Sequence, residues 1–256
     1  MPPIQRILGN PGKAAMGTNS QRLRTILSLA QTRLTTLIHD VWFHPRLDVL
    51  YPEFLFATYG VTTASAPAMR LAARCCAPAA CGDPLNQWLS DYYLEHAAEE
   101  ESHGEWLLAD LASLGVARER VLKRLPYPSV AALVGSQYYW MQHVHPIAYL
   151  GYIAVIEEPA QIDFLRKVSE RTGIPLASMS CHIRHAELDP EHVAAFDANL
   201  DSLPLTPELR DLITVSAITT IGHLETVFTD ILEHFERIGD PANAATIFTA
   251  SGTVLI

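Results

Sequence analysis

Three observations predict that this chain folds as an all-α bundle of about seven to nine helices. Apolar residues recur at spacings of three and four along most of its 256 residues, the period of a helix with one buried face. No segment alternates apolar and polar residues with β-branched enrichment, and no Asn-Gly or Asp-Gly dipeptide joins two candidate strands. Proline and glycine stand at the expected helix ends.

The first elements follow from these start and stop signals. Residues 1–20 are rich in Gly, Pro, Asn and Ser without periodicity, so we expect a flexible arm. Ser20 is a good N-cap for a first helix that ends before His44-Pro45. Two further helices should run up to Pro78, separated at residues 60–65.

The most clearly delimited helix is expected over residues 84–114, because Asp83 can cap its start and Gly115 can end it. Later helices are separated by proline or glycine breaks, and the last ends at the Gly-Asp-Pro sequence 239–241. We expect one domain over 21–240, with 241–256 as a tail. The expected helices cover residues 21–43, 46–59, 64–79, 84–114, 128–144, 147–158, 160–172, 175–200 and 207–238.

Composition narrows the function. Hydrophobic residues make up 49% of the chain, enough to fill a sizeable core. The formal net charge is -10, and the 18 Lys and Arg residues form no basic run, which argues against a nucleic-acid or anionic-membrane partner. We therefore expect a small-molecule substrate.

The sequence is also typical of a cytoplasmic protein. Its four cysteines have neither the number nor the spacing of a disulfide framework or a C-x2-C zinc site, so we expect reduced thiols. The first 17 residues carry Pro and Gly where a signal peptide needs an apolar run. The longest apolar stretch, 146–156, is about half the length of a membrane span.

One arrangement of metal-binding residue types occurs twice. At about 100° per residue, positions i, i+4 and i+7 of a helix share one face, so each copy can aim two imidazoles and one carboxylate at a common point. Six N and O donors exceed what one zinc ion needs, and the mixture suits a pair of iron ions in a helix bundle. The two copies are His96-x3-Glu100-x2-His103 and His185-x3-Asp189-x2-His192.

Between the two copies, Glu157 ends an apolar helix and is a candidate bridging ligand, with Gly151 permitting a close helix approach. A carboxylate directed into water explains Glu157 about equally well, and Glu158 is its alternative. In the first copy, Glu99 or Glu100 could be the ligand. We prefer Glu100, because E-x2-H places carboxylate and imidazole one turn apart.

Each histidine taken singly would more often be an ordinary core or surface residue. Several histidines and carboxylates on one core-facing helix side make a metal site the better interpretation, because buried ionisable groups need a partner or a metal. In the second copy Pro190 removes a helix hydrogen bond, so we expect a kink or a restart at Asp189. We infer that this segment becomes ordered when metal binds.

The substrate pocket is predicted from aromatic and polar residues ahead of Glu157 and on the last helix. Aromatic rings and histidines there could form an amphipathic wall with a few hydrogen-bond donors. Ordinary helix packing explains the first three residues equally well, and solvent exposure explains the fourth. The candidates are Tyr139, His143, Tyr149 and His223.

With these residues in view, the chain resembles the haem-oxygenase-like di-iron oxidases and oxygenases, in the branch described as iron-containing redox enzymes. The resemblance extends from His44-Pro45 to about residue 235. It rests on the segments HAAEEESHGEWLLADLASLG (96–115), HPIAYLGYIAVIEE (145–158) and HAELDPEH (185–192).

The resemblance implies a haem-oxygenase-like helical bundle that binds two iron ions and uses O2 as co-substrate. By position it assigns the ligands Glu100, His103, Glu157, His185, Asp189 and His192. His96 matches a position that is a carboxylate in some relatives, so it is either a further ligand or a neighbour of one. Oxidation of the substrate would pass through a peroxo-di-iron(III) intermediate.

The implied substrate is a small metabolite that is amino-acid-derived or bears an amine or carboxylate. The reaction would be N-oxygenation, desaturation or oxidative C–C cleavage, and the fold does not select among them. No nucleotide or flavin motif appears, so electrons would come from an external donor or from the substrate. A homodimer through outward helix faces is compatible with the sequence but has no specific motif.

Two other functions fit some of these features. A ferritin-like iron-storage or iron-sensing protein would also carry [DE]-x2-H elements, although such sites are usually dominated by carboxylates. A metal-free haem-oxygenase-like hydrolase or cofactor-maturation enzyme would use the histidines as proton shuttles and would bind no metal.

Overall fold

The structure, a computed structural model, describes residues 17–77, 83–157 and 161–238. Within helices, the side chains of residues 188–190 and 236–238 lie outside the description. The predicted all-α fold is confirmed, because the described residues form eleven α-helices and two short 3-10 helices and contain no strand. Most of the predicted arm and the whole predicted tail, 241–256, lie outside the described residues.

The helices follow one another with short connections. Their bounds are α1 Asn19–Ala30, α2 Thr32–Trp42, α3 Leu47–Cys76, α4 Pro84–Glu100, α5 His103–Ser113, α6 Arg118–Lys123, α7 Pro128–His143, η1 Pro146–Ala148, α8 Tyr149–Ile156, α9 Ile162–Thr172, η2 Leu176–Met179, α10 Ser180–Ser202 and α11 Pro207–Ile238.

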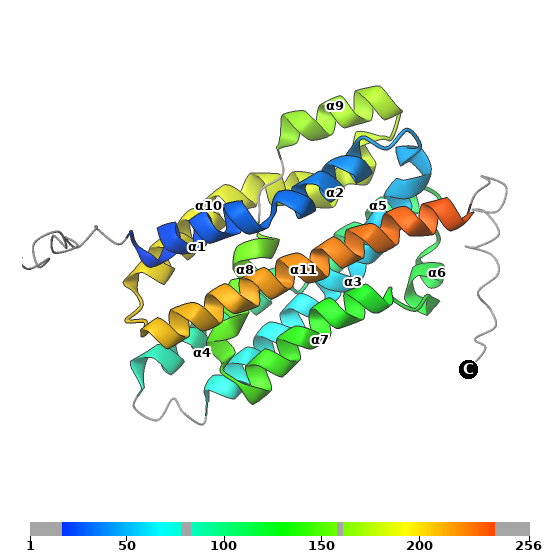
Figure 1. Cartoon of the computed structure of the whole chain (residues 1–256). Helices are drawn as coiled ribbons and strands as arrows, with labels where there is room; N and C mark the ends of the chain where they lie inside the picture. Colours follow the sequence, from blue (N-terminus) through cyan, green and yellow to red (C-terminus); the bar gives the residue numbers. More distant parts are fainter. Residues whose placement is uncertain (1–16, 78–82, 158–160, 239–256) are drawn as a thin grey trace, which may run out of the picture.

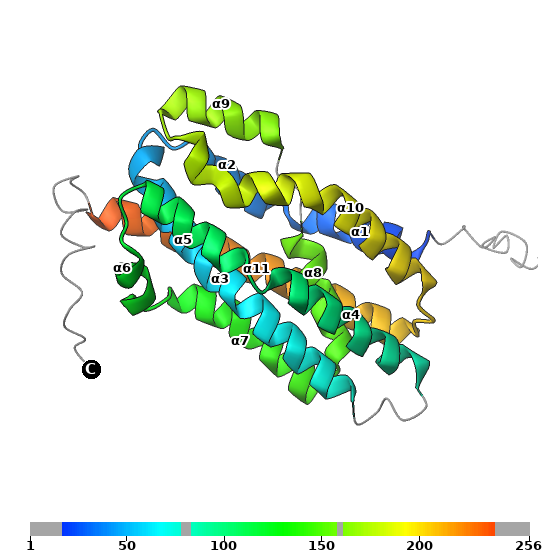
Figure 2. The same ribbon diagram turned by 180° about the vertical axis from the view of Figure 1, so that it is seen from behind.

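Two long helices, α3 and α11, form the centre of the bundle. Helix α11 runs the length of the molecule and packs against α2, α3, α7 and α8 (Figure 1). Helix α3 packs against α4, α5 and α7, and the opposite view shows α4, α5 and α10 on the other face (Figure 2). The apolar residues of both helices meet in one continuous core.

Helix α11 is also the one described helix that is long and apolar enough to cross a membrane, over Pro207–Phe235. Burial inside the bundle is another reason for the apolar composition of α11. An apolar helix in the middle of a bundle buries its side chains against other helices, as α11 does.

Several predicted helix boundaries were wrong. Residues 47–76 form one helix, α3, where two were expected, although Pro52 and Pro67 lie inside it. Each proline removes one backbone hydrogen bond, but packing on α4, α5, α7 and α11 holds the helix together. The first predicted helix divides into α1 and α2 at Gln31, and its N-cap is Thr18 instead of Ser20.

The predicted helix over 84–114 is also interrupted. Helix α4 ends at Glu100, a turn covers Glu101 and Ser102, and α5 begins at His103. Gly104 lies where α5 crosses α3, since a Cβ atom there would come within 2.8 Å of Thr63 Cγ2. At the second ligand motif the prediction failed in the other direction. A restart was expected at Asp189, but α10 continues through this residue.

Close helix contact fixes α8 against α11. A Cβ atom on Gly151 would lie 2.2 Å from the carbonyl oxygen of Ile213 and 2.8 Å from the backbone nitrogen of Ala217. Only glycine fits at such a distance, so the predicted close approach at Gly151 is confirmed. This contact sets the position of Glu157, which follows the end of α8.

A buried carboxylate aligns α10 with α5. Asp110, which is 0% exposed, accepts hydrogen bonds from the backbone N–H groups of Ser180 and Cys181 at 3.1 and 3.0 Å. These are orphan donors at the start of α10, and a carboxylate there also interacts favourably with the helix dipole. The side chain therefore joins α5, which begins at His103, to α10, which carries the second set of candidate ligands.

Candidate metal centre

A small enclosed cavity of ≈ 60 Å³ lies among α3, α4, α5, α8 and α10. Five of the seven predicted ligands line it, together with apolar side chains of α3 and α8. Its walls are Val61, Thr62, Ser65, Met69, Glu100, His103, Tyr152, Ile153, Ile156, Glu157, His185 and His192.

One end of the cavity gathers Glu100, His103 and His185. Glu100 Oε2 lies 3.1 Å from His103 Nδ1, and the ring centroids of His103 and His185 are 4.9 Å apart. His103 is buried, and its Nδ1 has no hydrogen-bond partner despite this short distance. Two metal-binding atoms this close together without a hydrogen bond between them suit a shared metal ion. Ligand atoms about 2.1 Å from one ion lie about 3 Å from each other.

The other end gathers His96, Glu157 and His192. His96 Nε2 lies 3.4 Å from Glu157 Oε1, and the ring centroids of His96 and His192 are 6.0 Å apart. Glu157 Oε2 is buried without a hydrogen-bond partner. Each end therefore offers two imidazoles and one carboxylate.

The two ends arise because α10 passes α4 and α5 in the opposite chain direction. His185 meets His103, whereas His192, two turns later, meets His96. The turn at residues 101–102 separates His96 from His103 along the chain. Each sequence motif therefore contributes to both ends, instead of forming one end by itself.

Charge and burial act against each other at the histidines. Burial lowers the pKa of His96, but the hydrogen bond and charge of Glu157, with the charges of Glu99 and Glu100, raise it above its usual value. Burial lowers the pKa of His185, although the charge of Glu100 opposes this. A neutral imidazole is the form that binds a metal ion.

The donor set fits iron, as judged by its buried atoms. One oxygen atom, Glu157 Oε2, and one nitrogen atom, His103 Nδ1, are buried at the cavity without a hydrogen-bond partner. Imidazole and carboxylate together are ligands that iron accepts. Among the described residues, no three His, Cys, Asp or Glu side chains are arranged to hold a metal ion as they stand. The side chain of Asp189 lies outside the described residues.

The remaining predicted site residues lie away from the cavity. Glu99 is exposed, whereas Glu100 points into the cavity, which supports the preference for Glu100. Tyr139 and His143 are exposed on α7, and His223 is half-buried on α11. Tyr149 is buried and stacks on Tyr152, which does line the cavity, but Tyr149 itself does not. Glu158 lies outside the described residues.

Two aromatic residues next to the candidate ligands were not predicted. Trp106 stacks on His103 at 4.0 Å between ring centroids and contacts His185 edge-on at 6.1 Å. The hydroxyl of Tyr92 lies 3.4 Å from His96 Nε2. Their spacings signal these roles, because Trp106 follows His103 by three residues and Tyr92 precedes His96 by four, which are same-face spacings in a helix.

A family model described as iron-containing redox enzyme matches residues 56–221, well over half of the chain. The chain belongs to the iron-containing redox enzyme family. The matched region runs from α3 into α11 and includes all seven candidate ligands of this family member. No functionally curated protein matches the chain.

Solved structures similar to this family member show the same fold. A domain of unknown function with a haem-oxygenase-like fold from Shewanella denitrificans has a TM-score of 0.74 and 20% identity, covering 94% of this chain and 100% of that one. A TenA homologue from Pseudomonas syringae has a TM-score of 0.63 at 13% identity, with 88% and 97% coverage. A second TenA homologue, from P. horikoshii, has a TM-score of 0.54 at 14% identity and covers 84% of this chain and 98% of that one. The predicted haem-oxygenase-like fold is therefore confirmed, although eleven helices exceed the seven to nine expected.

Proposed function

We propose that this protein is a non-haem di-iron oxidase or oxygenase that oxidises a small metabolite with O2. The observation that carries the proposal is the division of six candidate donors into two similar groups, each with two histidines and one glutamate, around one enclosed cavity. One metal ion would not need two such groups.

The two groups would each hold one iron ion. Glu100, His103 and His185 would hold one ion, and His96, Glu157 and His192 the other, with Asp189 as a further ligand on α10. Iron bound there would supply the redox chemistry that activates O2 and oxidises the substrate. Small side-chain rotations would accompany binding, because no three described donors are already in place.

Several residues of the chain would protect and position these ligands. Met69, Ile153 and Ile156 line the cavity and would keep bulk water away from it.

Without metal, the raised pKa of His96 favours a proton on its ring beside Glu157. Metal binding must displace that proton, so affinity for iron should fall as the pH falls.

The number of histidines distinguishes this proposal from iron storage. Four imidazoles and two carboxylates line or adjoin the cavity, whereas a storage site would be expected to contain mainly carboxylates. The other alternative, a metal-free haem-oxygenase-like maturation enzyme, predicts that the protein binds no iron. We further propose that an external donor, or the substrate, supplies electrons in the cytoplasm.

The decisive test is the iron content of protein reconstituted with Fe(II) under anaerobic conditions. We expect about two irons per chain and a Mössbauer spectrum of coupled ions after exposure to O2. His185→Ala and His96→Ala should each lose about one iron, whereas Glu99→Gln should keep both. Fewer than about one iron per chain in the unmodified protein would rule out the di-iron proposal.

Trp106 provides a second measurement on the same site. Because its ring stacks on His103, a paramagnetic ion such as Co(II) bound at that end should quench its fluorescence. Trp106→Phe should remove most of the metal-dependent quenching, while Trp140→Phe should leave it unchanged. Equal quenching in all three proteins would place the metal elsewhere.

A further inference from the structure

Two side chains in the wall of the cavity are easily oxidised. Met69 and Tyr152 line it beside the candidate ligands, and both are buried. Oxidants convert methionine to its sulfoxide, and a tyrosine ring loses an electron far more readily than a phenylalanine ring does. A metal centre that reacts with O2 while no substrate is bound would therefore oxidise its own walls, unless electrons reach it from elsewhere.

One line of aromatic rings joins the cavity to the surface of the molecule. Tyr152 stacks on Tyr149 at 5.0 Å between ring centroids, and Tyr149 meets Tyr93 edge-on at 5.8 Å. Tyr93 in turn meets Tyr92 at 5.8 Å, and Tyr92 stacks on Trp88 at 4.9 Å. Trp88 is half-buried in the first half of α4, so the line ends at the surface.

A shorter line reaches a candidate ligand directly. The ring centroid of Tyr92 lies 4.4 Å from that of His96, and the Tyr92 hydroxyl lies 3.4 Å from His96 Nε2. Both lines therefore meet at Tyr92 and share Trp88 as their outermost ring. Rings in contact exchange electrons rapidly, because the rate of electron tunnelling falls steeply with the distance between donor and acceptor.

Packing alone does not account for the tyrosines of the longer line. Tyr149 is 1% exposed, and its hydroxyl is buried without a hydrogen-bond partner among the described residues. A buried hydroxyl in that state destabilises the fold, and phenylalanine would fill almost the same space without this cost. Tyrosine differs from phenylalanine in having a ring that can be oxidised and reduced reversibly.

A second tryptophan lies at the other end of the cavity, but a positive charge covers it. Trp106 stacks on His103, and the guanidinium carbon of Arg184 lies 4.6 Å from the Trp106 ring. A cation at this distance opposes the loss of an electron from the ring, because the oxidised ring would also be positive. Oxidation of Trp106 is therefore disfavoured.

The surroundings of Trp88 carry the opposite charge. Helix α4 contains no Lys or Arg. Asp91 and Glu95 follow Trp88 by three and seven residues, which are same-face spacings in a helix, and both are exposed. Their negative charges stabilise an oxidised, positively charged ring. The charge distribution therefore directs oxidation from the cavity toward Trp88.

We propose that Trp88 and Tyr92 form a redox relay that carries electrons from a soluble thiol to the metal centre when no substrate is bound. Tyr92 gives one electron to the oxidised iron, and its hydroxyl proton passes to water. Trp88 then gives one electron to Tyr92, which regains a proton. The thiol reduces Trp88 and releases its own proton, so two such cycles convert two thiols into one disulfide. This inference rests on the proposed di-iron function, which supplies the oxidant.

The test uses full-length protein reconstituted with Fe(II), with iron content and O2 consumption measured on every sample. O2 is added without substrate and without thiol, and the frozen sample is examined by electron paramagnetic resonance. We expect an organic radical in the unmodified protein. Ring-deuterated tryptophan should narrow its signal, because the unpaired electron lies on Trp88 once the relay has acted.

Two conservative variants separate the two steps of the relay. Tyr92→Phe should lose the tryptophan radical although Trp88 is still present, because both lines of rings pass through Tyr92. Trp88→Phe should keep a radical, but on Tyr92, so that ring-deuterated tyrosine narrows the signal and tryptophan does not. Trp140→Phe on α7 is the matched control and should behave like the unmodified protein.

The response to a soluble thiol tests the exit of the relay. Added dithiothreitol should discharge the radical quickly in the unmodified protein and slowly in Trp88→Phe, since Tyr92 is only 7% exposed. This comparison remains decisive even if Tyr92→Phe binds less iron, because Trp88 is one ring removed from His96. Equal thiol sensitivity of the two proteins would overturn the proposal.

Three further results would also overturn the relay. They are a signal that survives Tyr92→Phe unchanged, a signal that disappears in Trp106→Phe but not in Trp88→Phe, and the absence of any organic radical from protein that binds two irons and consumes O2. The last result would leave the di-iron function intact. Protein that retains no iron would instead reject the di-iron function and the relay together.

Discussion

At the scale of single residues, His182 shows how packing sets a protonation state. Its ring stacks on Phe54 at 5.4 Å between centroids and meets Trp42 edge-on at 5.6 Å. Burial, and then the charge of His185, lower the pKa of His182 to about 4. The native state therefore keeps this imidazole neutral at pH values where an unfolded chain would protonate it.

We predict that this histidine makes the fold acid-sensitive. Because the native pKa of His182 lies below its unfolded value near 6.5, the unfolded state binds more protons between pH 6.5 and 4. Stability should fall across this window by up to about 1.4 kcal/mol per pH unit from this group alone. Urea unfolding from pH 7 to 4.5 should show a smaller loss in His182→Phe than in the unmodified protein. Equal losses would contradict the assignment.

At the scale of elements, most helices could be predicted, whereas their breaks could not. Periodicity located α7, α9 and α11 to within about two residues. The break after Glu100 carries no proline and arises where α5 meets α3 at Gly104, a tertiary contact that periodicity does not record. The break expected at residues 60–65 was wrong for the same reason, since neighbouring helices hold α3 together.

Gly151 is the element contact whose loss should be most damaging. In Gly151→Ala the new Cβ would meet backbone atoms of α11, which cannot rotate away as a side chain could. We expect a loss of about 3 kcal/mol or more in urea unfolding, at or above the upper end of ordinary overpacking. Gly135→Ala on α7 is the control. Its Cβ would meet nothing within 4 Å, so the helix should gain about 0.5–1 kcal/mol. Similar effects at both positions would refute a specific α8–α11 contact.

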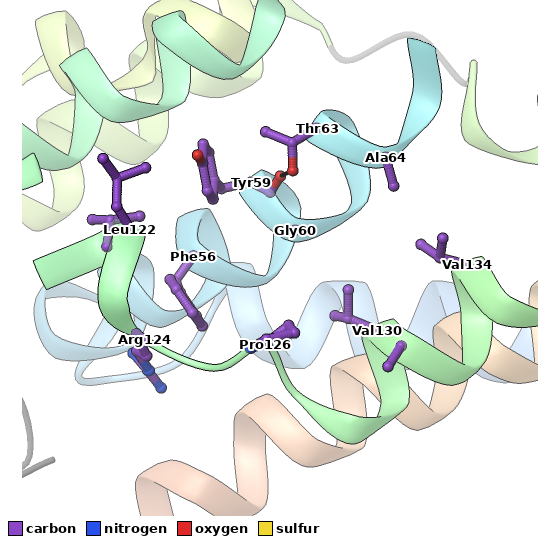
Figure 3. A pocket seen from close by; sticks show the side chains of 12 residues that line it. Phe56, Tyr59, Gly60, Thr63, Ala64, Leu122, Arg124, Pro126, Val130 and Val134 are labelled. Carbon is purple, nitrogen blue, oxygen red and sulfur yellow. Dashed lines mark hydrogen bonds between the residues drawn. The ribbon is translucent and has the colours of Figure 1, made fainter. Parts of the chain in front are cut away.

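At the scale of the whole molecule, the site joins segments that lie far apart in the sequence. Spacing alone could nominate the ligand candidates, because i, i+4, i+7 patterns survive any packing. It could not show that His185 faces His103 while His192 faces His96, since this pairing depends on the antiparallel course of α10. The hollow between α3 and α7 was equally hidden, because its walls come from segments that are separate in the sequence (Figure 3).

Because the candidate ligands lie on α4, α5, α10 and the end of α8, metal should join these elements and stabilise the bundle as a whole. At a free metal concentration about 100 times the Kd, the gain would be about 2.7 kcal/mol. The gain should be largest along residues 180–195, where Pro190 removes one backbone hydrogen bond and coordination would hold the helix instead.

Hydrogen exchange on metal-free and iron-loaded protein would measure this gain locally. We expect stronger protection of residues 180–195 with iron, and a smaller change in α7, which carries no candidate ligand. His192→Ala should reduce the difference in residues 180–195 and leave α7 unaffected. Equal protection of residues 180–195 with and without iron would show that the backbone bonds of α10 hold the helix unaided. In that case metal would bind to a helix that is already fixed.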